Sequence, residues 1–125
     1  MSTTEQLERL LRKYYGYVAD LEGTGVEILD LLAIRDQIQL LLEQSTPESV
    51  LPQRLYNQVY QLDDVFWRER DVFLQVIGGR ELRHARFQRQ SPRSHWWWYL
   101  DQLKASPRVV GEPGQLLARA FAPAG

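Results

Sequence analysis

The sequence predicts an all-α protein: a single small bundle of four to five helices with an irregular C-terminal tail. Apolar residues recur at three- and four-residue intervals through most of the first 77 residues, and turn-forming residues separate these stretches. A chain of 125 residues suits one domain. We therefore expect one helical domain over residues 1–125, with residues 106–125 as a loosely packed tail.

The first two helices are predicted over residues 4–22 and from a start at Thr24 to about Gln44. The first has one apolar face, formed by Leu7, Leu11, Tyr14, Val18 and Leu21. Thr24 and Glu27 have the spacing of a capping box that would open the second. That helix is apolar around much of its circumference, which is typical of a central helix, through Ile28, Leu31, Leu32, Ile38, Leu41 and Leu42.

A third helix is predicted from about Gln53 to the Gly78-Gly79 pair. Its apolar positions are Leu55, Val59, Leu62, Phe66, Phe73 and Val76, and the position between the two phenylalanines is filled by Glu69 or Arg70. The run Val72–Ile77 is apolar on both faces, so an antiparallel hairpin around Gly78-Gly79, giving an α+β fold, is the alternative. We favour the helix because the helical spacing continues from upstream.

A further helix is predicted over residues 92–105, with Ser91 as its cap and Pro92 in its first turn. The next stretch, SPRVVGEPG, has the glycines and prolines of a loop. No window approaches the roughly 18 apolar residues that a membrane span needs. The N-terminus lacks the apolar core of a secretory signal, so we expect a cytoplasmic protein.

The residues that catalysis or metal binding would need are scarce. The chain has no cysteine and two histidines. Glu81 and His84 have the E-x-x-H spacing of some metal sites, but the second such motif and the further glutamates are missing. The neighbouring Asp63 and Asp64 would point about 100° apart on a helix, unlike an acid–base pair. The sequence therefore predicts no enzyme, no metal site and no cofactor.

Two segments, LLAIRDQIQ and DDVFWRERDVF, resemble motifs of the helical chorismate mutases, and Arg35, Asp64, Arg68 and Glu69 stand at the matching positions. The separation of Asp64 from Arg68 departs from the D-x-x-R-E element of that family. No lysine lies between the two segments, where the substrate-binding lysine of that family is expected. We attribute the resemblance to leucine-rich helices and keep a small helical enzyme as a minor alternative.

Charge is divided unevenly along the chain. The net charge is −1, but residues 1–77 carry seven Lys/Arg and thirteen Asp/Glu, whereas residues 78–125 carry eight and three. The basic part either lies against the acidic helices of its own chain or binds an acidic partner. Internal complementarity is the interpretation we favour.

The basic part contains an arginine-rich and aromatic segment. Its arginines recur every three or four residues, at Arg80, Arg83, Arg86, Arg89 and Arg93. On a helix, steps of three drift around the axis, so the first four would not form a single basic line. Arginine binds carboxylate and phosphate groups in a bidentate manner and stacks on aromatic rings.

Three consecutive tryptophans, Trp96 to Trp98, precede Tyr99. On a helix three such positions span about 200° of arc, so one face cannot bury them all. We expect Trp96 in the core with Leu100 and Leu103, Trp97 at its flank, and Trp98 directed away from it. Trp98 would then pack under the tail, stack with arginine, or bind a partner.

The predicted function is a non-enzymatic protein–protein interaction module, an adaptor, regulator or assembly factor. Its partner would be another protein, acidic or apolar at the contact, and a homo-oligomer is also compatible with the pattern. The predicted partner-binding residues are Arg80, Arg83, Arg86, Arg89, Arg93, Trp97, Trp98 and Tyr99. The alternative is an accessory nucleic-acid-binding protein that uses the same segment, because arginine interleaved with aromatic rings suits single strands.

Overall fold

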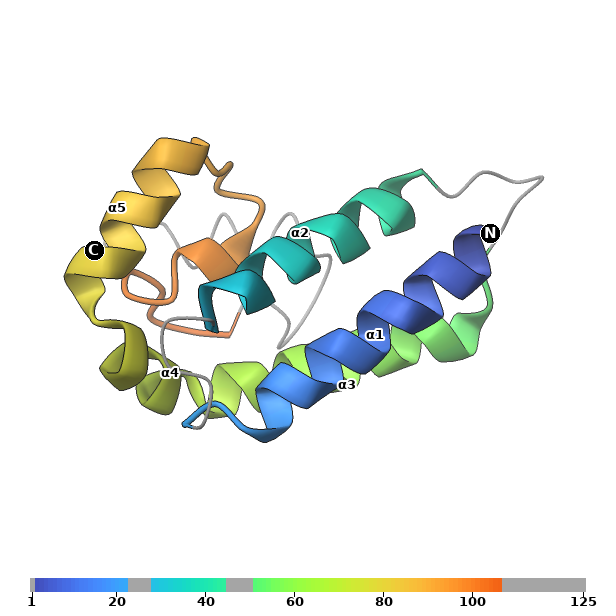
Figure 1. Ribbon diagram of the computed structural model, residues 1–125, viewed down its shortest axis with the longest axis horizontal. Coiled ribbons are helices and arrows are strands. Elements are labelled where there is room, and N and C mark those ends of the chain that lie inside the picture. The colour runs from blue at the N-terminus through green and yellow to red at the C-terminus, as the bar shows by residue number, and fades with distance from the viewer. Residues whose placement is uncertain (1, 23–27, 45–50, 107–125) are drawn as a thin grey trace.

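The computed structural model describes residues 2–22, 28–44 and 51–106 (Figure 1). All regular structure in these residues is helical, with no strand, so the all-α prediction is confirmed. No helix in this part of the chain is both long and apolar enough to cross a membrane. The expected capping box at Thr24 and Glu27, and the tail from residue 107 onward, lie outside the described residues.

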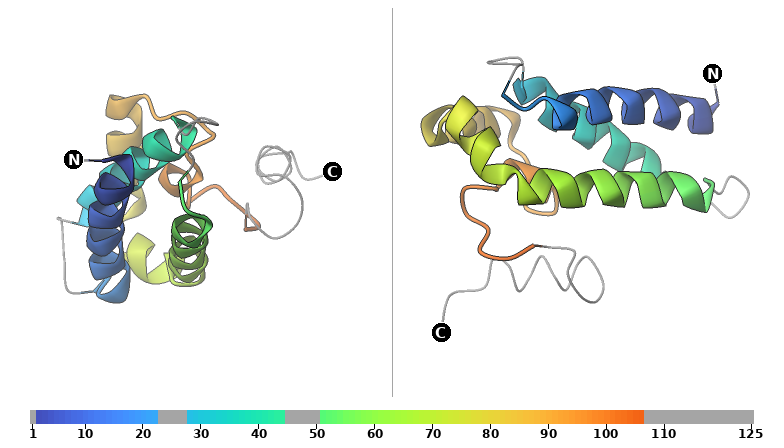
Figure 2. Two further views of the ribbon diagram at one scale, coloured as in Figure 1. Left: turned by 90° about the vertical axis from the view of Figure 1, so that its right-hand side faces the viewer. Right: turned by 90° about the horizontal axis from the view of Figure 1, so that it is seen from below.

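Three long helices form the body of the molecule: α1 (Thr3–Ala19), α2 (Leu29–Glu43) and α3 (Gln53–Arg68). The hydroxyl of Ser2 starts α1 by accepting a hydrogen bond from the backbone N–H of Glu5. In Figures 1 and 2, α1 and α3 run side by side in the same direction, and α2 runs back the opposite way. Helix α1 packs against both of the others.

The core consists of the apolar faces that the sequence predicts. All five residues of the predicted α1 stripe are buried: Leu7, Leu11, Tyr14, Val18 and Leu21. From α2 and α3 the core takes Leu31, Leu32, Ile38, Leu55, Val59 and Phe66. Leu62 and Leu41 are only half-buried, so the stripes of α2 and α3 are narrower than their leucine content indicates.

The single helix predicted from Gln53 to Gly78 is interrupted at Glu69. Helix α3 ends at Arg68 and α4 spans Arg70–Ile77. The break falls where the apolar spacing lacks a core residue, because Glu69 is exposed between buried Phe66 and Phe73. The guanidinium of Arg70 donates to the carbonyl of Trp67, 2.8 Å away, and so satisfies one of the carbonyls at the end of α3.

Gly78 turns the chain from α4 into α5 (Gly79–Arg89) with a φ of 82°. A hairpin does not form here, and the helical interpretation of residues 72–77 is confirmed. Gln90, with a φ of 52°, ends α5 in the left-handed region. Helices α4 and α5 form one end of the molecule (Figure 1).

The prediction of a helix over residues 92–105 is wrong. After Gln90 the chain turns back toward α2, and its regular structure is a short 3-10 helix, η2 (Trp96–Trp98). One α-helical face could not bury three adjacent rings, whereas this tight turn places Trp96 against α3 and both Trp97 and Trp98 against α2. Leu100 and Leu103 are buried as predicted.

Candidate functional site

All three consecutive tryptophans are buried, with exposed fractions of 5%, 1% and 1% for Trp96, Trp97 and Trp98. Trp96 packs against Phe66 of α3, with ring centroids 6.2 Å apart. The ring of Trp97 lies under the guanidinium of Arg35 on α2, at 4.2 Å. The expectation that Trp98 points away from the core is therefore wrong, because it assumed a regular helix or strand.

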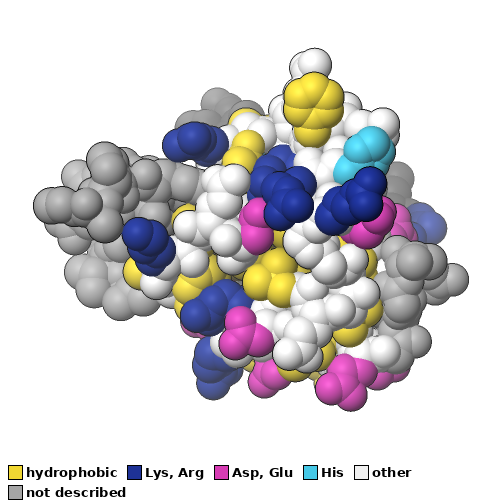
Figure 3. All heavy atoms as spheres, turned by 90° about the vertical axis from the view of Figure 1, so that its left-hand side faces the viewer, with side chains coloured by type: hydrophobic (Ala, Val, Ile, Leu, Met, Phe, Trp, Pro, Cys, Tyr) yellow, Lys and Arg dark blue, Asp and Glu magenta, His cyan; other side chains and the backbone are white. Residues whose placement is uncertain are grey.

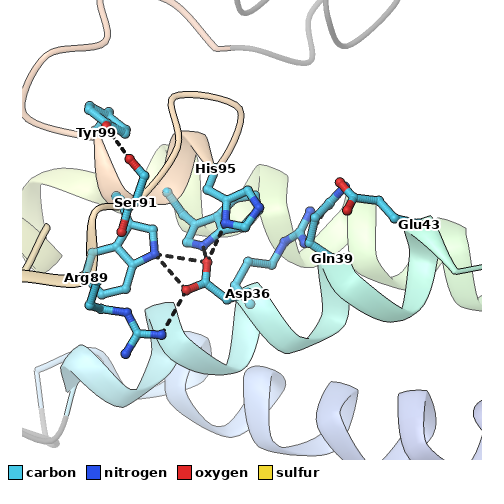
Figure 4. A network of polar contacts seen from close by, with 10 residues as sticks. Asp36, Gln39, Glu43, Arg89, Ser91, His95 and Tyr99 are labelled. Atoms are coloured by element: carbon cyan, nitrogen blue, oxygen red, sulfur yellow. Dashed lines mark hydrogen bonds and ion pairs between the residues drawn. The ribbon is translucent and has the colours of Figure 1, made fainter.

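One carboxylate, that of Asp36 on α2, accepts hydrogen bonds from several side chains of this segment (Figure 4). The indole N–H groups of Trp97 and Trp98 donate to it at 2.8 and 3.0 Å. His95 donates through Nδ1 at 2.8 Å, and Arg89 of α5 forms an ion pair at 3.2 Å. We call these five residues the Asp36 network. Its contacts join the end of α5 and the η2 segment to α2.

The Asp36 carboxylate is held in its charged form. Partial burial alone would raise its pKa, but the hydrogen bonds from His95, Trp98 and Trp97 outweigh burial, and the pKa lies below its ordinary value. Each indole N–H of Trp97 and Trp98 would otherwise be a buried donor without a partner. The network therefore explains how two such rings can be buried side by side.

A second network joins the three long helices. Arg35 of α2 binds Asp63 of α3 in a bidentate manner, with both contacts at 2.9 Å. The hydroxyl of Tyr14 on α1 donates to the same carboxylate at 2.6 Å, and the amide oxygen of Gln39 accepts from Arg35 at 3.1 Å. We call these four residues the Arg35 network.

Three residues of the Arg35 network are closed to solvent, with Tyr14 0%, Arg35 3% and Asp63 1% exposed, whereas Gln39 is half-buried. Burial and the charge of Asp63 raise the pKa of Tyr14 well above its ordinary value, so Tyr14 keeps its proton. Burial lowers the pKa of Arg35, but the facing carboxylate more than offsets this, and the pKa is raised. A protonated Tyr14 and a charged Arg35 suit a structural role in holding Asp63.

Asp64, Glu81 and His84, which the sequence offered as possible acid–base or metal-binding residues, belong to neither the Asp36 network nor the Arg35 network. Asp64 is exposed whereas its neighbour Asp63 is buried, as expected for adjacent helical positions. Glu81 and His84 are both exposed on α5. Within the described residues, no three His, Asp or Glu side chains gather as metal ligands would.

The structure divides the predicted partner-binding residues into two groups. Trp97 and Trp98 are buried, and the hydroxyl of Tyr99 donates to the carbonyl of Ser91 at 2.6 Å. Arg86 binds Asp101 at 2.6 Å and the carbonyl of Trp98 at 2.9 Å, and Arg89 binds Asp36 and covers the ring of Trp98. These residues stabilise the fold of the segment.

The second group, Arg80, Arg83 and Arg93, is exposed. In the described part of the chain, no acidic side chain forms an ion pair with Arg80 or Arg83. Positions 80, 83 and 87 share one face of α5, so the two arginines lie on the same side of the helix as Phe87, which is 82% exposed. We call Arg80, Arg83 and Phe87 the α5 stripe.

A shallow hollow of about 390 Å³ adjoins the α5 stripe. Its walls are formed by Arg83, Phe87, Gln90 and Tyr99, together with Arg86 and Ser91. Figure 3 faces the end of the molecule that contains α4 and α5, and it shows an apolar side chain that stands out at the top, with basic side chains, acidic side chains and a histidine on the surface below it. The hollow and the stripe form a continuous basic and aromatic surface.

Sequence reasoning missed Phe87 and both networks. The available signals were a lone aromatic residue among polar ones on α5, and two charged residues at core positions. Arg35 interrupts the apolar run LLAIRDQI, and Asp63 follows Val59 by four residues on the core face of α3.

Comparison of the chain with protein-family models, curated proteins and solved structures gave no match.

Proposed function

We propose that this chain is a non-enzymatic protein–protein interaction module that docks a partner on the α5 stripe. The observation that carries the proposal is the exposure of Phe87, 82% of which faces solvent on a helix with two arginines beside it. A phenylalanine side chain that stays exposed to solvent lacks the roughly 1.5–3 kcal/mol of stabilising free energy that burial would give. A partner that covers the ring would recover this free energy.

The charge of α5 indicates what kind of surface the partner presents. The helix carries Arg80, Arg83, Arg86 and Arg89 against one acidic residue, Glu81. Arg86 and Arg89 already bind carboxylates of this chain, so Arg80 and Arg83 remain for a partner. The complementary surface is a pocket for Phe87 with carboxylates at its rim.

A protein partner suits this surface better than nucleic acid does. Binding to single strands needs exposed rings on which bases stack. Trp97 and Trp98 are buried, which leaves Phe87 as the one fully exposed ring among the described residues of the segment. A single exposed ring with two cations on the same helix face has the composition of an interface hot spot, since aromatic residues and arginine are enriched there.

A pull-down from native lysate with the full chain tests the proposal. We expect Phe87→Ser and Arg83→Glu each to reduce recovery of the principal partner at least about tenfold, because truncating an interface anchor costs about 2 kcal/mol or more. Leu40→Ser is the matched control, since Leu40 is another exposed large apolar side chain, 55% exposed, on α2 and outside both the α5 stripe and its hollow. Equal recovery by the wild type and both α5 variants would contradict the proposal.

A further inference from the structure

A groove of about 800 Å³ lies between α1 and α3, away from the α5 stripe. Its apolar lining includes Leu11 of α1, which is buried, and Leu62 and Val65 of α3, which are half-buried. The groove has more apolar than polar surface, and it is open along its length. We call it the α1–α3 groove.

The two ends of the groove differ. At one end the guanidinium of Arg54 on α3 binds the carboxylate of Glu8 on α1 at 2.8 Å, which joins the two helices. At the other end lies Tyr15, a large ring of α1 that is 63% exposed. Tyr15 lies seven helical steps after Glu8, which is about 10 Å along the helix at about 1.5 Å each.

The lining of the groove carries more positive than negative charge. It contains two guanidinium groups, Arg12 and Arg54, and one carboxylate, Glu8. Glu8 is bound to Arg54, and Arg12 forms no ion pair with any described acidic side chain. An occupant that carries a carboxylate opposite Arg12 would complete the charge pairing.

We propose that the α1–α3 groove binds a helix of a partner protein. This helix would place two or three apolar residues, spaced by three and four, on Leu11, Leu62 and Val65, with an acidic residue facing Arg12. Two parallel helices with an apolar furrow between them form the surface on which an amphipathic helix packs. The exposed ring of Tyr15 would pack against the last turn of the bound helix.

Two occupants from this chain fit the groove less well. In a symmetric dimer through this face, each hollow would meet the same hollow, which would leave both unfilled. The C-terminal segment GQLLARAF has apolar residues at helical spacing, but its one charged residue is Arg119, which has the same sign as Arg12. A separate, acidic helix is the occupant that the charges favour.

Photocrosslinking in the cells from which the protein comes tests this inference. Tyr15 of the full chain is replaced by p-benzoylphenylalanine, and the crosslinked peptide is identified by mass spectrometry. We expect one partner segment with apolar residues at helical spacing and at least one acidic residue. A synthetic peptide of that segment is then titrated onto the intact protein.

Arg12→Glu should weaken binding of this peptide at least tenfold. Lys13→Glu is the matched control, because it makes the same change of charge on the next residue, which does not line the groove. Phe87→Ser should leave peptide binding unchanged, so this test and that of the α5 stripe can fail separately. A crosslink to a second copy, to residues 107–125 or to no protein would overturn the inference, as would equal effects of Arg12→Glu and Lys13→Glu.

Discussion

At the scale of single residues, Asp36 has an unusual number of partners for one carboxylate. It accepts from the indoles of Trp97 and Trp98, from His95 and from Arg89. These donors come from residues 89–98, and Asp36 is on α2. Loss of its charge therefore weakens all four of these contacts between residues 89–98 and α2 at once.

Asp36→Asn should lower the free energy of unfolding by about 2–3 kcal/mol at neutral pH, because hydrogen bonds to a charged group are worth about 1.5–3 kcal/mol. The pKa of Asp36 is depressed in the folded protein. Its contribution is therefore complete above the unfolded value, near pH 4, and is lost as the pH falls through the folded pKa.

Urea unfolding at several pH values checks this prediction. The difference in unfolding free energy between wild type and Asp36→Asn should shrink as the pH falls below about pH 4. Asp71→Asn, at an exposed position of α4, serves as the control and should have little effect. A difference that stays the same down to pH 2 would contradict the role of the Asp36 charge.

The Arg35 network leads to a prediction about paired substitutions. Arg35→Met or Asp63→Leu alone should destabilise the protein by about 3–5 kcal/mol, because either leaves a buried charge without its partner. The double variant should cost far less than the sum of the two, since both charges are then gone. A double-mutant cycle by chemical denaturation measures this coupling, and additive effects would refute it.

At the scale of the elements, the boundary between α4 and α5 depends on one glycine. Gly78 has a φ of 82°, in a region that residues with a side chain disfavour, whereas no positive φ occurs at Gly79, the first residue of α5. A β-carbon at Gly78 would contact no atom within 4 Å, so backbone conformation and not space makes glycine necessary there.

Gly78→Ala should lower the free energy of unfolding by about 1–3 kcal/mol, because a φ of 82° with a ψ of 142° is a backbone region that residues with a side chain rarely adopt. Gly79→Ala is the control: its β-carbon would lie 3.3 Å from the flexible end of Arg83. We expect that variant to be within about 0.5 kcal/mol of the wild type, or more stable by up to about 1 kcal/mol. Thermal unfolding of both variants decides the matter, and equal destabilisation would show that backbone conformation is not the cause.

The elements also show what the sequence could predict. The helices α1, α2 and α3 follow from apolar spacing, because an amphipathic helix needs only one buried face. The η2 segment does not follow, because its conformation depends on partners that are distant in sequence. Asp36 lies about 60 residues before the tryptophans that bind it, and no local pattern marks such a pairing.

At the scale of the whole molecule, the uneven charge distribution is partly satisfied within the chain. Arg89 and His95, from the basic part, bind Asp36 of the acidic part. Arg86 binds Asp101, which lies in the basic part itself. Periodicity predicted that the arginines of α5 would point in different directions, but which of them face inward depends on the tertiary position of two carboxylates.

The packing of the aromatic segment predicts how the molecule unfolds. Trp96 packs against Phe66 of α3, and Trp97 and Trp98 bind Asp36 of α2, so the segment contacts two of the three long helices. The tryptophans cannot become exposed without loss of contacts that those helices also need. We therefore expect one cooperative transition that includes the helices and the aromatic segment.

Near-UV circular dichroism reports the packing of the tryptophans and far-UV circular dichroism reports helix content, and the two thermal transitions should coincide. Acrylamide should quench the native tryptophan fluorescence weakly, since η2 buries three of the four tryptophans. Quenching should rise only within the same transition. An earlier near-UV transition, with the helices intact, would instead mean that residues 91–103 open as a separate unit while α1, α2 and α3 remain folded.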